Sequence, residues 1–383
     1  MNFKLSPPVG NKILLSELQS EESNLLPLNP MFFESGTASL SIAISIAIKS
    51  RPDVKTPKVI LPGYACPDLI SAAKAAGAYP QLVDLAPDSY QYEIAELENA
   101  IDTDTVAIVF VSFLGLKNNI DILSKEQKRN LLIIEDSAQG FPRTLSSEYW
   151  NGDLTICSFG RGKPLSLLGG GAVFVNNPLY VETAREFQLK PISSSFSQKL
   201  IYKLKVRLHN FLLNPFCYFW LTKIKFLKIG ATKYSKLESI NACSDYILGN
   251  MQINIEAYSA KTQMITQYTE GLKNIKSDQL VDLVLNSNFD NETPLLRYPI
   301  LIKNLSIRNK LLTSLLNNGI GASPMYKNIL PEIEGVEVSD YQIKGELKNA
   351  KDFANSLITL PLNEQMDNKQ VRQVVEIIAK ELE

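Results

Sequence analysis

Histidine is almost absent from this chain, because His209 is the single one among 383 residues. A histidine base, a Ser–His pair and a histidine-rich metal site are therefore nearly excluded, and acid–base work must fall to lysine, carboxylates, tyrosine or cysteine. Cysteine is also scarce, and no two cysteines form a CxxC pair. They are Cys66, Cys157, Cys217 and Cys243. This spacing disfavours zinc, so we expect no metal site, and it fits a reducing cytoplasm.

An excess of charge of one sign is missing as well. The formal net charge is −1, which provides no global basic field to attract nucleic acid. No continuous apolar core follows the first lysine, as a signal peptide would require, so we expect a cytoplasmic protein. Apolar residues make up 45% of the chain and charged residues 21%, which is typical of a soluble globular protein.

Buried strand patterns alternate with helical patterns along the first half of the chain. The strand-like ranges are 58–64, 105–115 and 129–140, and the helical ones include 35–50 and 92–101. This alternation predicts an α/β fold with a mostly parallel central sheet flanked by helices. Ligands of such sheets bind beyond the carboxyl ends of the strands.

The length of the chain and a change of pattern predict two domains. At 383 residues the chain is long for one core. We expect a large domain over 1–245, which includes a basic and aromatic insertion at about 187–240. A smaller α+β domain would follow over 246–383.

The stretch SFGRGKPLSLLGGGAVFVNN (158–177) places Lys163 among glycines between two strand-like runs. Such a lysine could clamp a phosphate, lie in solvent as a surface charge, or attach a cofactor covalently. A Walker A loop is excluded because Pro164 follows the lysine and Cys157 stands where the first glycine belongs. A GxGxxG motif fails at Leu165. An imine-forming lysine, which needs glycines that leave space for a flat ring, fits better.

Two further features would complete a site around this lysine. Asp136, at the end of a buried strand, is the candidate carboxylate that keeps a pyridine nitrogen protonated. A phosphate cup would come from a helix N-terminus and a strand-end hydroxyl. Its candidate members are Gly36, Thr37, Ala38 and Ser158. We expect these groups to converge with Lys163 on one crevice.

The motifs, in this order, resemble the DegT/DnrJ/EryC1/StrS group of pyridoxal 5'-phosphate (PLP) aminotransferases. The matching segments are SGTASL, VILPGY, AGAYPQLVDL, IIEDSAQG, SFGRGK, LGGGAVFVNN, LLNNGIGASPMYK and SLITLPL. They cover most of the chain except about 187–240. The resemblance implies a fold type I PLP-dependent transferase, usually a homodimer. It implies amino transfer to a nucleotide-linked keto-sugar, with glutamate as the usual donor, for a surface glycan or polysaccharide.

The resemblance also assigns roles to single residues. It makes Lys163 the catalytic Schiff-base lysine and Asp136 the catalytic partner of the pyridine nitrogen. Gln139 would bond the phenolic oxygen of the cofactor. The residues that would hold the phosphate are Thr37, Ala38 and Ser158.

Three positions depart from the pattern of the family. Cys66 stands at the cofactor-binding position where the family usually has a stacked aromatic ring, and Tyr64 or aliphatic groups could take that place. Ser112 replaces a histidine, and the Asn-Tyr-Arg segment that often reaches the neighbouring subunit is not recognisable. These changes leave the cofactor chemistry intact and open the choice of keto substrate to a non-sugar or a lipid-carrier-linked compound.

A non-catalytic or regulatory relative that keeps the fold is the alternative function. Some family members replace the lysine and act as dehydratases or sensors. Lys163 is present in this chain, which favours transamination.

No aspartate or glutamate occurs between Phe187 and Leu237, a stretch rich in basic and aromatic residues. The run FLLNPFCYFWLTKIKFLKIG looks membrane-like, but Pro215 interrupts it, and its uncharged part is shorter than the roughly twenty residues that span a bilayer. Three interpretations stay open: burial at a dimer interface, peripheral membrane contact through 197–230, and binding of an anionic substrate tail. No nucleic-acid module is visible, so nucleic acid is not expected as a partner.

Overall fold

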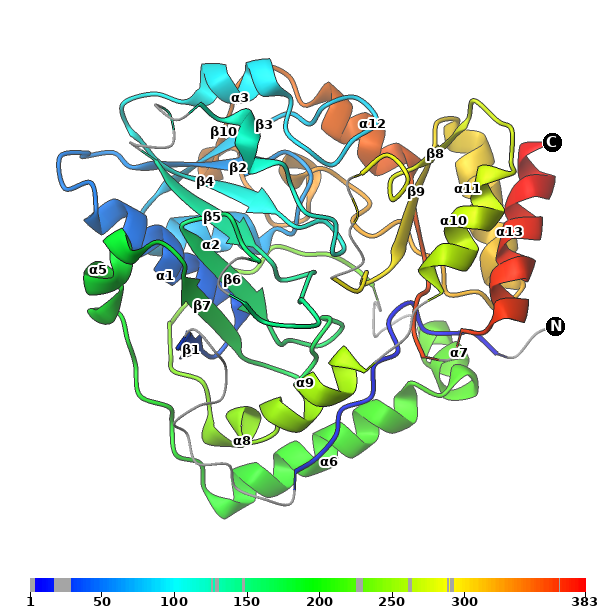
Figure 1. The fold of residues 1–383 in the computed structure, drawn as a ribbon, viewed down its shortest axis with the longest axis horizontal. Helices are drawn as coiled ribbons and strands as arrows, with labels where there is room; N and C mark the ends of the chain where they lie inside the picture. Colours follow the sequence, from blue (N-terminus) through cyan, green and yellow to red (C-terminus); the bar gives the residue numbers. More distant parts are fainter. Residues whose placement is uncertain are drawn as a thin grey trace.

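The computed structural model describes residues 4–16, 29–124, 127, 131–146, 149–224, 230–260, 264–287, 289, 293–364 and 366–383. Its centre is an eight-stranded sheet with the strand order β1-β7-β6-β5-β4-β2-β3-β10 (Figure 1). The strands are β1 (Met31–Phe33), β2 (Lys58–Pro62), β3 (Tyr79–Val83), β4 (Thr105–Val111), β5 (Leu132–Asp136), β6 (Leu154–Ser158), β7 (Gly171–Val175) and β10 (Gln342–Ile343).

Most neighbours in this sheet are parallel, as the alternating pattern predicts. The pairs β2–β3, β2–β4, β4–β5, β5–β6 and β3–β10 are all parallel. Strand β7 is the exception, because it pairs antiparallel with β6 and with β1. The connection between β6 and β7 is the loop that carries Lys163, and it contains no helix to return the chain for a parallel crossover.

Helices cover both faces of the sheet. The helices that follow the early strands are α1 (Gly36–Lys49), α2 (Asp68–Ala76), α3 (Ile94–Ala100) and α5 (Val181–Arg185). In β4, Ala107 and Val109 belong to the core shared with α1 and α2, whereas Ile108 and Phe110 belong to a second core with α3. A strand buried on both faces reads as a continuous apolar run, which confirms a buried strand within 105–115, although the strand ends at Val111.

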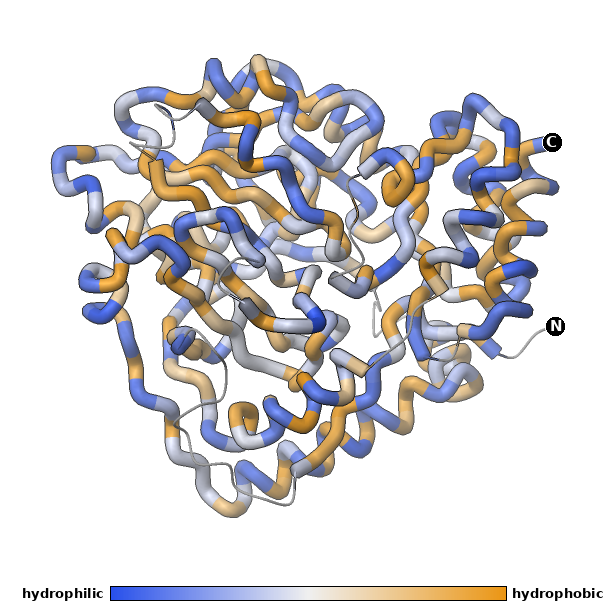
Figure 2. Tube along the Cα trace, in the orientation of Figure 1, coloured by the Kyte–Doolittle hydropathy of each residue, from blue (hydrophilic) through white to orange (hydrophobic). Residues whose placement is uncertain are grey.

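A third core forms on the β6–β7 side of the sheet. Phe174 of β7 packs there with residues of the helices α6 (Phe196–Leu212), α8 (Asp245–Leu248) and α9 (Met251–Ser259). From α6 this core takes Tyr202 and Val206, which lie one turn apart. Figure 2 shows that hydrophobic segments concentrate in the central strands, while polar residues prevail in many of the loops around them.

The C-terminal part adds a three-stranded antiparallel sheet with the order β11-β9-β8. Its strands are β8 (Leu280–Asp282), β9 (Tyr298–Ile302) and β11 (Leu357–Leu360). The helices of this part are α10 (Ile265–Lys273), α11 (Leu305–Asn317), α12 (Lys348–Ser356) and α13 (Asn368–Leu382). The α+β character matches the sequence pattern, and the boundary at 245/246 stays a prediction. Strand β10, although it comes from this half, pairs with β3 of the large sheet.

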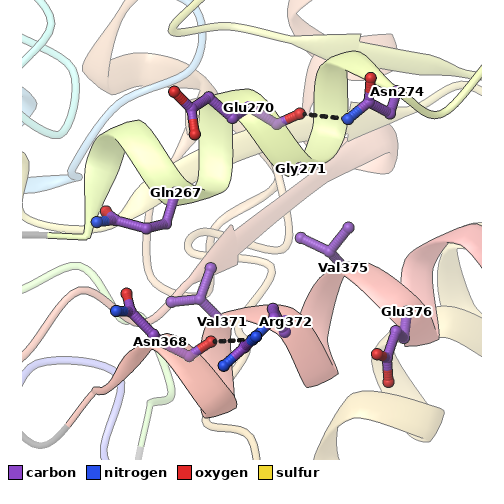
Figure 3. Close-up of a pocket in the computed structure, with 9 residues that line it drawn as sticks. All are labelled: Gln267, Glu270, Gly271, Asn274, Asn368, Val371, Arg372, Val375 and Glu376. Carbon is purple, nitrogen blue, oxygen red and sulfur yellow. Dashed lines mark hydrogen bonds between the residues drawn. The ribbon is translucent and has the colours of Figure 1, made fainter.

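Helices α10 and α13 border a groove of about 430 Å³. Gly271 lets them approach closely, because a Cβ at this position would lie 2.8 Å from Cγ2 of Val375. Figure 3 shows the polar side chains along the groove, among them Gln267 and Arg372. None of the residues that the sequence singles out lines this groove, so it is separate from the candidate site.

Helix α6 and the short helix α7 (Pro215–Lys223) run along one edge of the molecule, with the N-terminal segment beside them (Figure 1). Asn210 joins the two, since its Nδ2 donates to the Ile13 carbonyl at 2.8 Å and its Oδ1 accepts from the Ile13 amide at 2.9 Å. The Leu5 amide donates to the Pro215 carbonyl at 3.0 Å. Within the described residues, no helix is long and apolar enough to cross a membrane.

We predict that Gly171→Ala destabilises the protein. A Cβ on Gly171 would lie 2.6 Å from Oγ of Ser39 and would overlap the Ser35 backbone, so β7 and the start of α1 must separate. Overpacking of this kind costs about 1–3 kcal/mol. Urea unfolding followed by circular dichroism measures the loss. Gly249→Ala, where the nearest atom would lie at 3.3 Å, is the control, and equal stability of the two variants would contradict the prediction.

Candidate active site

Two strands of the parallel sheet end at residues that the sequence singles out. Asp136 is the last residue of β5 and Ser158 is the last residue of β6. The strands are neighbours, and Asp136 pairs with Ile156 in their register. Helix α1 begins beside them, because a Cβ on Gly36 would lie 2.5 Å from Cβ of Ser158 and 2.7 Å from its Oγ. Only glycine therefore allows the helix N-terminus to approach the end of β6 this closely.

The first turn of α1 has donors available for an anion. The first four amides of an α-helix lack partners within the helix. Ser35 is the N-cap, and its Oγ accepts from the Ala38 amide at 3.1 Å. The Ser39 amide reaches the Ser35 carbonyl at 3.0 Å. The Thr37 amide has no hydrogen-bond partner among the described residues and can bind a ligand, and no acidic residue lies in this first turn to repel one.

One carboxylate nevertheless lies close to the N-terminus of α1, where an anion would bind. Asp68 begins α2, and its Oδ2 accepts from the Thr37 hydroxyl at 3.2 Å. The Thr37 hydroxyl must turn from Asp68 to donate to an anion. Nothing in the sequence marks Asp68 as a site residue, because acidic side chains are common in the first turn of a helix.

Lys163 follows a glycine in a left-handed turn. Gly162 has φ +76°, and the Lys163 amide donates to the Gly160 carbonyl at 3.3 Å. The lysine is partly buried. Its positive charge acts on both Asp136, at the end of β5, and Cys66, two residues before α2. The structure thus brings together the lysine, the carboxylate and the helix N-terminus.

Burial governs the electrostatics of Asp136. Its Oδ1 accepts from the Ala138 amide at 2.9 Å, and no other hydrogen bond of this carboxylate occurs within the described ranges. Burial raises the pKa of Asp136, whereas the Ala138 amide and the charge of Lys163 lower it. A buried carboxylate with spare acceptor capacity suits a cationic N–H partner, which would lower its pKa further.

Gln139 belongs to a buried hydrogen-bond network with Leu114 and Tyr326. Its Oε1 accepts from the Leu114 amide, and its Nε2 donates to the Tyr326 hydroxyl, both at 3.0 Å. The Tyr326 hydroxyl also contacts the Cys66 thiol. The role of Gln139 toward a cofactor stays a prediction, and in the structure its amide holds Tyr326 in place.

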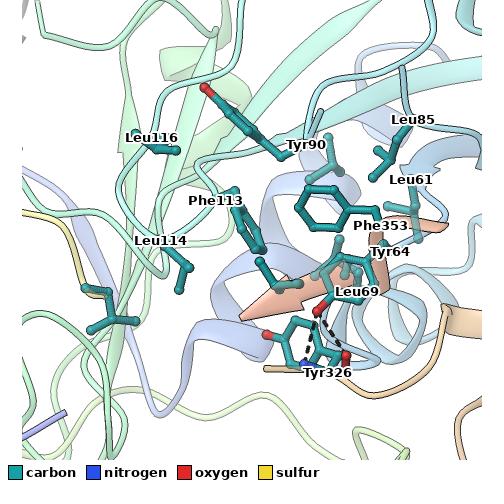
Figure 4. Packing of buried hydrophobic residues seen from close by; sticks show 14 of the residues in the cluster. Leu61, Tyr64, Leu69, Leu85, Tyr90, Phe113, Leu114, Leu116, Tyr326 and Phe353 are labelled. Atoms are coloured by element: carbon teal, nitrogen blue, oxygen red, sulfur yellow. Dashed lines mark hydrogen bonds between the residues drawn. The ribbon is translucent and has the colours of Figure 1, made fainter. Parts of the chain in front are cut away.

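Tyr64 packs in an aromatic cluster with Tyr326 and two phenylalanines (Figure 4). Its hydroxyl accepts from the Tyr326 amide at 3.1 Å and lies 3.0 Å from the Tyr326 carbonyl. Its ring meets Phe113 and Phe353 edge-on. Burial raises the pKa of the Cys66 thiol to about 12, so at neutral pH this residue is a small neutral group. The role of Cys66 at a cofactor stays a prediction.

Arg297, at the residue before β9, is a site candidate that sequence analysis missed. Its Nη1 donates to Oγ1 of Thr359 at a long 3.4 Å, and its buried Nε has no hydrogen bond partner within the part of the chain that the structure describes. Burial lowers its pKa, and the phenols of Tyr218 and Tyr326 oppose that shift. The signal in the sequence was one cation inside an apolar strand pattern, PLLRYPILI.

The profile of the DegT/DnrJ/EryC1/StrS aminotransferase family matches residues 31–379. The chain belongs to this family. The protein MosB of Rhizobium meliloti is 31% identical over 40% of this chain and 30% of its own length. A UDP-4-amino-4,6-dideoxy-N-acetyl-beta-L-altrosamine transaminase of Campylobacter jejuni is 26% identical over 91% of this chain and 84% of that protein. The alignments with the first curated relatives span less than half of those relatives' lengths.

Solved structures of the family share the fold. The S. venezuelae protein DesV, solved in complex with a ketimine intermediate, has a TM-score of 0.65 and 18% identity. The match covers 98% of this chain and 91% of DesV. The mostly parallel sheet flanked by helices is thus the fold of type I PLP-dependent aminotransferases, as the resemblance implies.

The residues of this family member fit PLP. At the glycine contact between α1 and β6, the Thr37 amide and the hydroxyls of Thr37 and Ser158 are the groups that would hold a phosphate. The buried Asp136 carboxylate can pair with a protonated ring nitrogen, and the Lys163 amine lies within electrostatic reach of both Asp136 and Cys66. Ala38 contributes less than sequence analysis expects, since its amide already bonds Ser35.

We predict that Asp68→Asn tightens PLP binding about tenfold, because it removes a carboxylate that would repel the phosphate. Asparagine can still accept from Thr37 and keeps the volume of the side chain. Equilibrium dialysis of the apoprotein against PLP measures the change. Asp352→Asn, on the exposed side of α12, removes an equal charge as the control. Weaker or unchanged PLP binding by Asp68→Asn would show that this carboxylate does not face the phosphate.

Proposed function

We propose that this protein is a PLP-dependent aminotransferase that moves an amino group from an amino acid, glutamate, to a nucleotide-linked keto-sugar. The observation that supports this most directly is the convergence of Lys163 and buried Asp136 beside the N-terminus of α1. The product would be an amino sugar for a surface glycan or polysaccharide. The transaminase name of the Campylobacter jejuni relative supports the substrate class.

The chain's own residues divide the work of such a reaction. When bound, PLP supplies an electron sink for the carbon that loses or gains a proton. Lys163 carries the amine that can take and return this proton. Asp136 would hold a proton on the ring nitrogen, and the Thr37 amide at the start of α1 would orient the phosphate.

The partly buried cation Arg297 favours an amino donor that carries a negative charge. Arg297 has an unsatisfied Nε and lies within electrostatic reach of Tyr326, which bonds Gln139. A donor carboxylate would satisfy this guanidinium with a charge-assisted hydrogen bond. We assign Arg297 to the carboxylate of glutamate on this ground.

A homodimer in the cytoplasm is the proposed working form. The family resemblance supports the dimer, and the four cysteines, none in a disulfide, support a reducing compartment. The same resemblance makes a non-catalytic relative the alternative function. Lys163 and Asp136 count against it, because a protein that only binds PLP needs neither group poised for proton transfer.

We predict that borohydride fixes PLP on Lys163. The purified protein should show a visible absorbance band that an amino donor bleaches, and reduction should leave the adduct on the peptide that contains Lys163. Peptide mass spectrometry locates it. Lys163→Ala should lose transamination while the phosphate cradle still holds PLP. An adduct on another lysine, or no band at all, would contradict the assignment.

We predict that Asp136→Asn lowers turnover at least about a hundredfold, the scale of losing one strong electrostatic partner of the reacting group. PLP should still bind, because the phosphate cradle is intact. Steady-state transamination with glutamate measures the change. Glu135→Gln is the control, since Glu135 points to the opposite face of β5 and accepts from the amides of Asn151 and Gly152. Near-native turnover of Asp136→Asn would mean that another group holds the ring nitrogen.

A further inference from the structure

Helix α6 has a buried side and an exposed apolar side. Tyr202 and Val206 face the third core. On the other side, large apolar residues follow one another at the three- and four-residue spacing of one helix face and stay in solvent, with 48–82% of their surface exposed. We call Phe196, Leu200, Leu204, Leu208 and Phe211 the α6 stripe.

The neighbouring helix α7 extends this apolar surface. Phe216 is 52% exposed and Trp220 is 49% exposed, and their rings lie 6.3 Å apart. Figures 1 and 2 show α6 and α7 at one edge of the molecule, where orange hydrophobic and blue hydrophilic segments alternate along α6. A contiguous apolar surface of this kind marks an interaction site, whereas isolated exposed apolar residues do not.

Basic side chains flank the stripe on both sides. Helical spacing places Lys203 and Arg207, which are one turn apart, along one border and Lys205 along the other. All three are exposed, and none of them forms an ion pair within the described residues. Lys199, nearer the core, is different because it pairs with Asp245 at 3.0 Å.

The sequence segment that contains the stripe carries charge of one sign only. The segment from Phe187 to Leu237 has ten lysines and arginines and no carboxylate, although the whole chain has a net charge of −1. Residues 225–229, which include two of these lysines, lie outside the described residues. A solvated surface normally mixes both signs, so this segment complements an anionic partner.

We propose that the α6 stripe and its basic flanks bind peripherally to an anionic lipid bilayer. Apolar side chains of an interfacial helix enter the boundary between head groups and acyl chains. Lysine and arginine stems lie along that apolar surface and carry their charges to lipid phosphates. The helix lies along the membrane surface, and no described helix is long and apolar enough to cross it.

A second copy of the chain is the competing occupant of this surface. In a two-fold interface the same patch meets itself, which would bring Lys203, Lys205 and Arg207 opposite the same cations. The segment offers no carboxylate to pair with them. Charge complementarity therefore favours the lipid surface over self-association.

The test uses the PLP-loaded protein and vesicles of phosphatidylglycerol and phosphatidylcholine at low salt. The protein should sediment with these vesicles, stay in solution with phosphatidylcholine alone, and dissociate as salt screens the charges. Trp220 provides a second readout. The chain has two tryptophans, and Trp150 is only 4% exposed, so a blue shift of emission on vesicle addition reports on α7.

Two triple variants separate the apolar from the electrostatic contribution. Leu200→Gln, Leu204→Gln and Leu208→Gln together should weaken vesicle binding at least about tenfold. Lys203→Gln, Lys205→Gln and Arg207→Gln together should weaken it on the order of a hundredfold at low salt. The control, Lys273→Gln, Lys276→Gln and Lys369→Gln together, removes equal charge from other exposed positions and should bind as the native protein does.

Three results would overturn the proposal. The native protein could fail to bind anionic vesicles at low salt, or the leucine variant could bind them as tightly as the native protein. Sedimentation equilibrium could also show that the leucine variant turns a dimer into a monomer, which would assign the stripe to a second copy. The absorbance band of bound PLP, which this surface should not affect, confirms that each variant is folded.

Discussion

The close contact between helix α1 and the strands β6 and β7 is the constraint on which the candidate site depends. Gly36 lies against Ser158, and Gly171 lies against Ser35 and Ser39, at distances that leave no room for a Cβ on either glycine. The contact places the amides at the start of α1 next to the ends of β5 and β6. A side chain on either glycine would move the N-terminus of α1 away from the strand ends that carry Asp136 and Ser158.

The charged groups of the candidate site would be neutralised by a ring that carries a positive nitrogen and a negative phosphate. Asp136 is buried and shares its surroundings with Lys163, yet Asp68 adds a second carboxylate near the cradle. A positive ring nitrogen beside Asp136 and a phosphate at the helix amides would neutralise groups that burial otherwise destabilises. Arg297 adds a partly buried cation whose Nε has no hydrogen-bond partner among the described residues.

The helix α6 connects this site with the surface of the protein. Its inner side completes the core on β6 and β7. The N-terminal segment that lies along it also contacts the loop that carries Lys163, where Asn11 donates to the Pro164 carbonyl at 3.0 Å. Its outer side is apolar and basic. One helix therefore supports the loop of Lys163 and offers a surface for an anionic partner.

The sequence by itself determined the α/β class and the mostly parallel sheet, and it predicted Lys163 and Asp136 as the central residues of the candidate site. Buried strands such as β4 are continuous apolar runs, and Lys163 and Asp136 stand at strand ends that glycines and acidic residues mark. Only the tertiary structure decided the antiparallel course of β7, the pairing of β10 with β3, and the contacts of Asp68, Arg297 and Tyr326 with the site. These depend on residues far apart in the chain, and no local pattern records which side chains meet when the sheet and its helices pack. The same holds for α6, whose spacing shows an amphipathic helix but not which of its apolar residues the core buries.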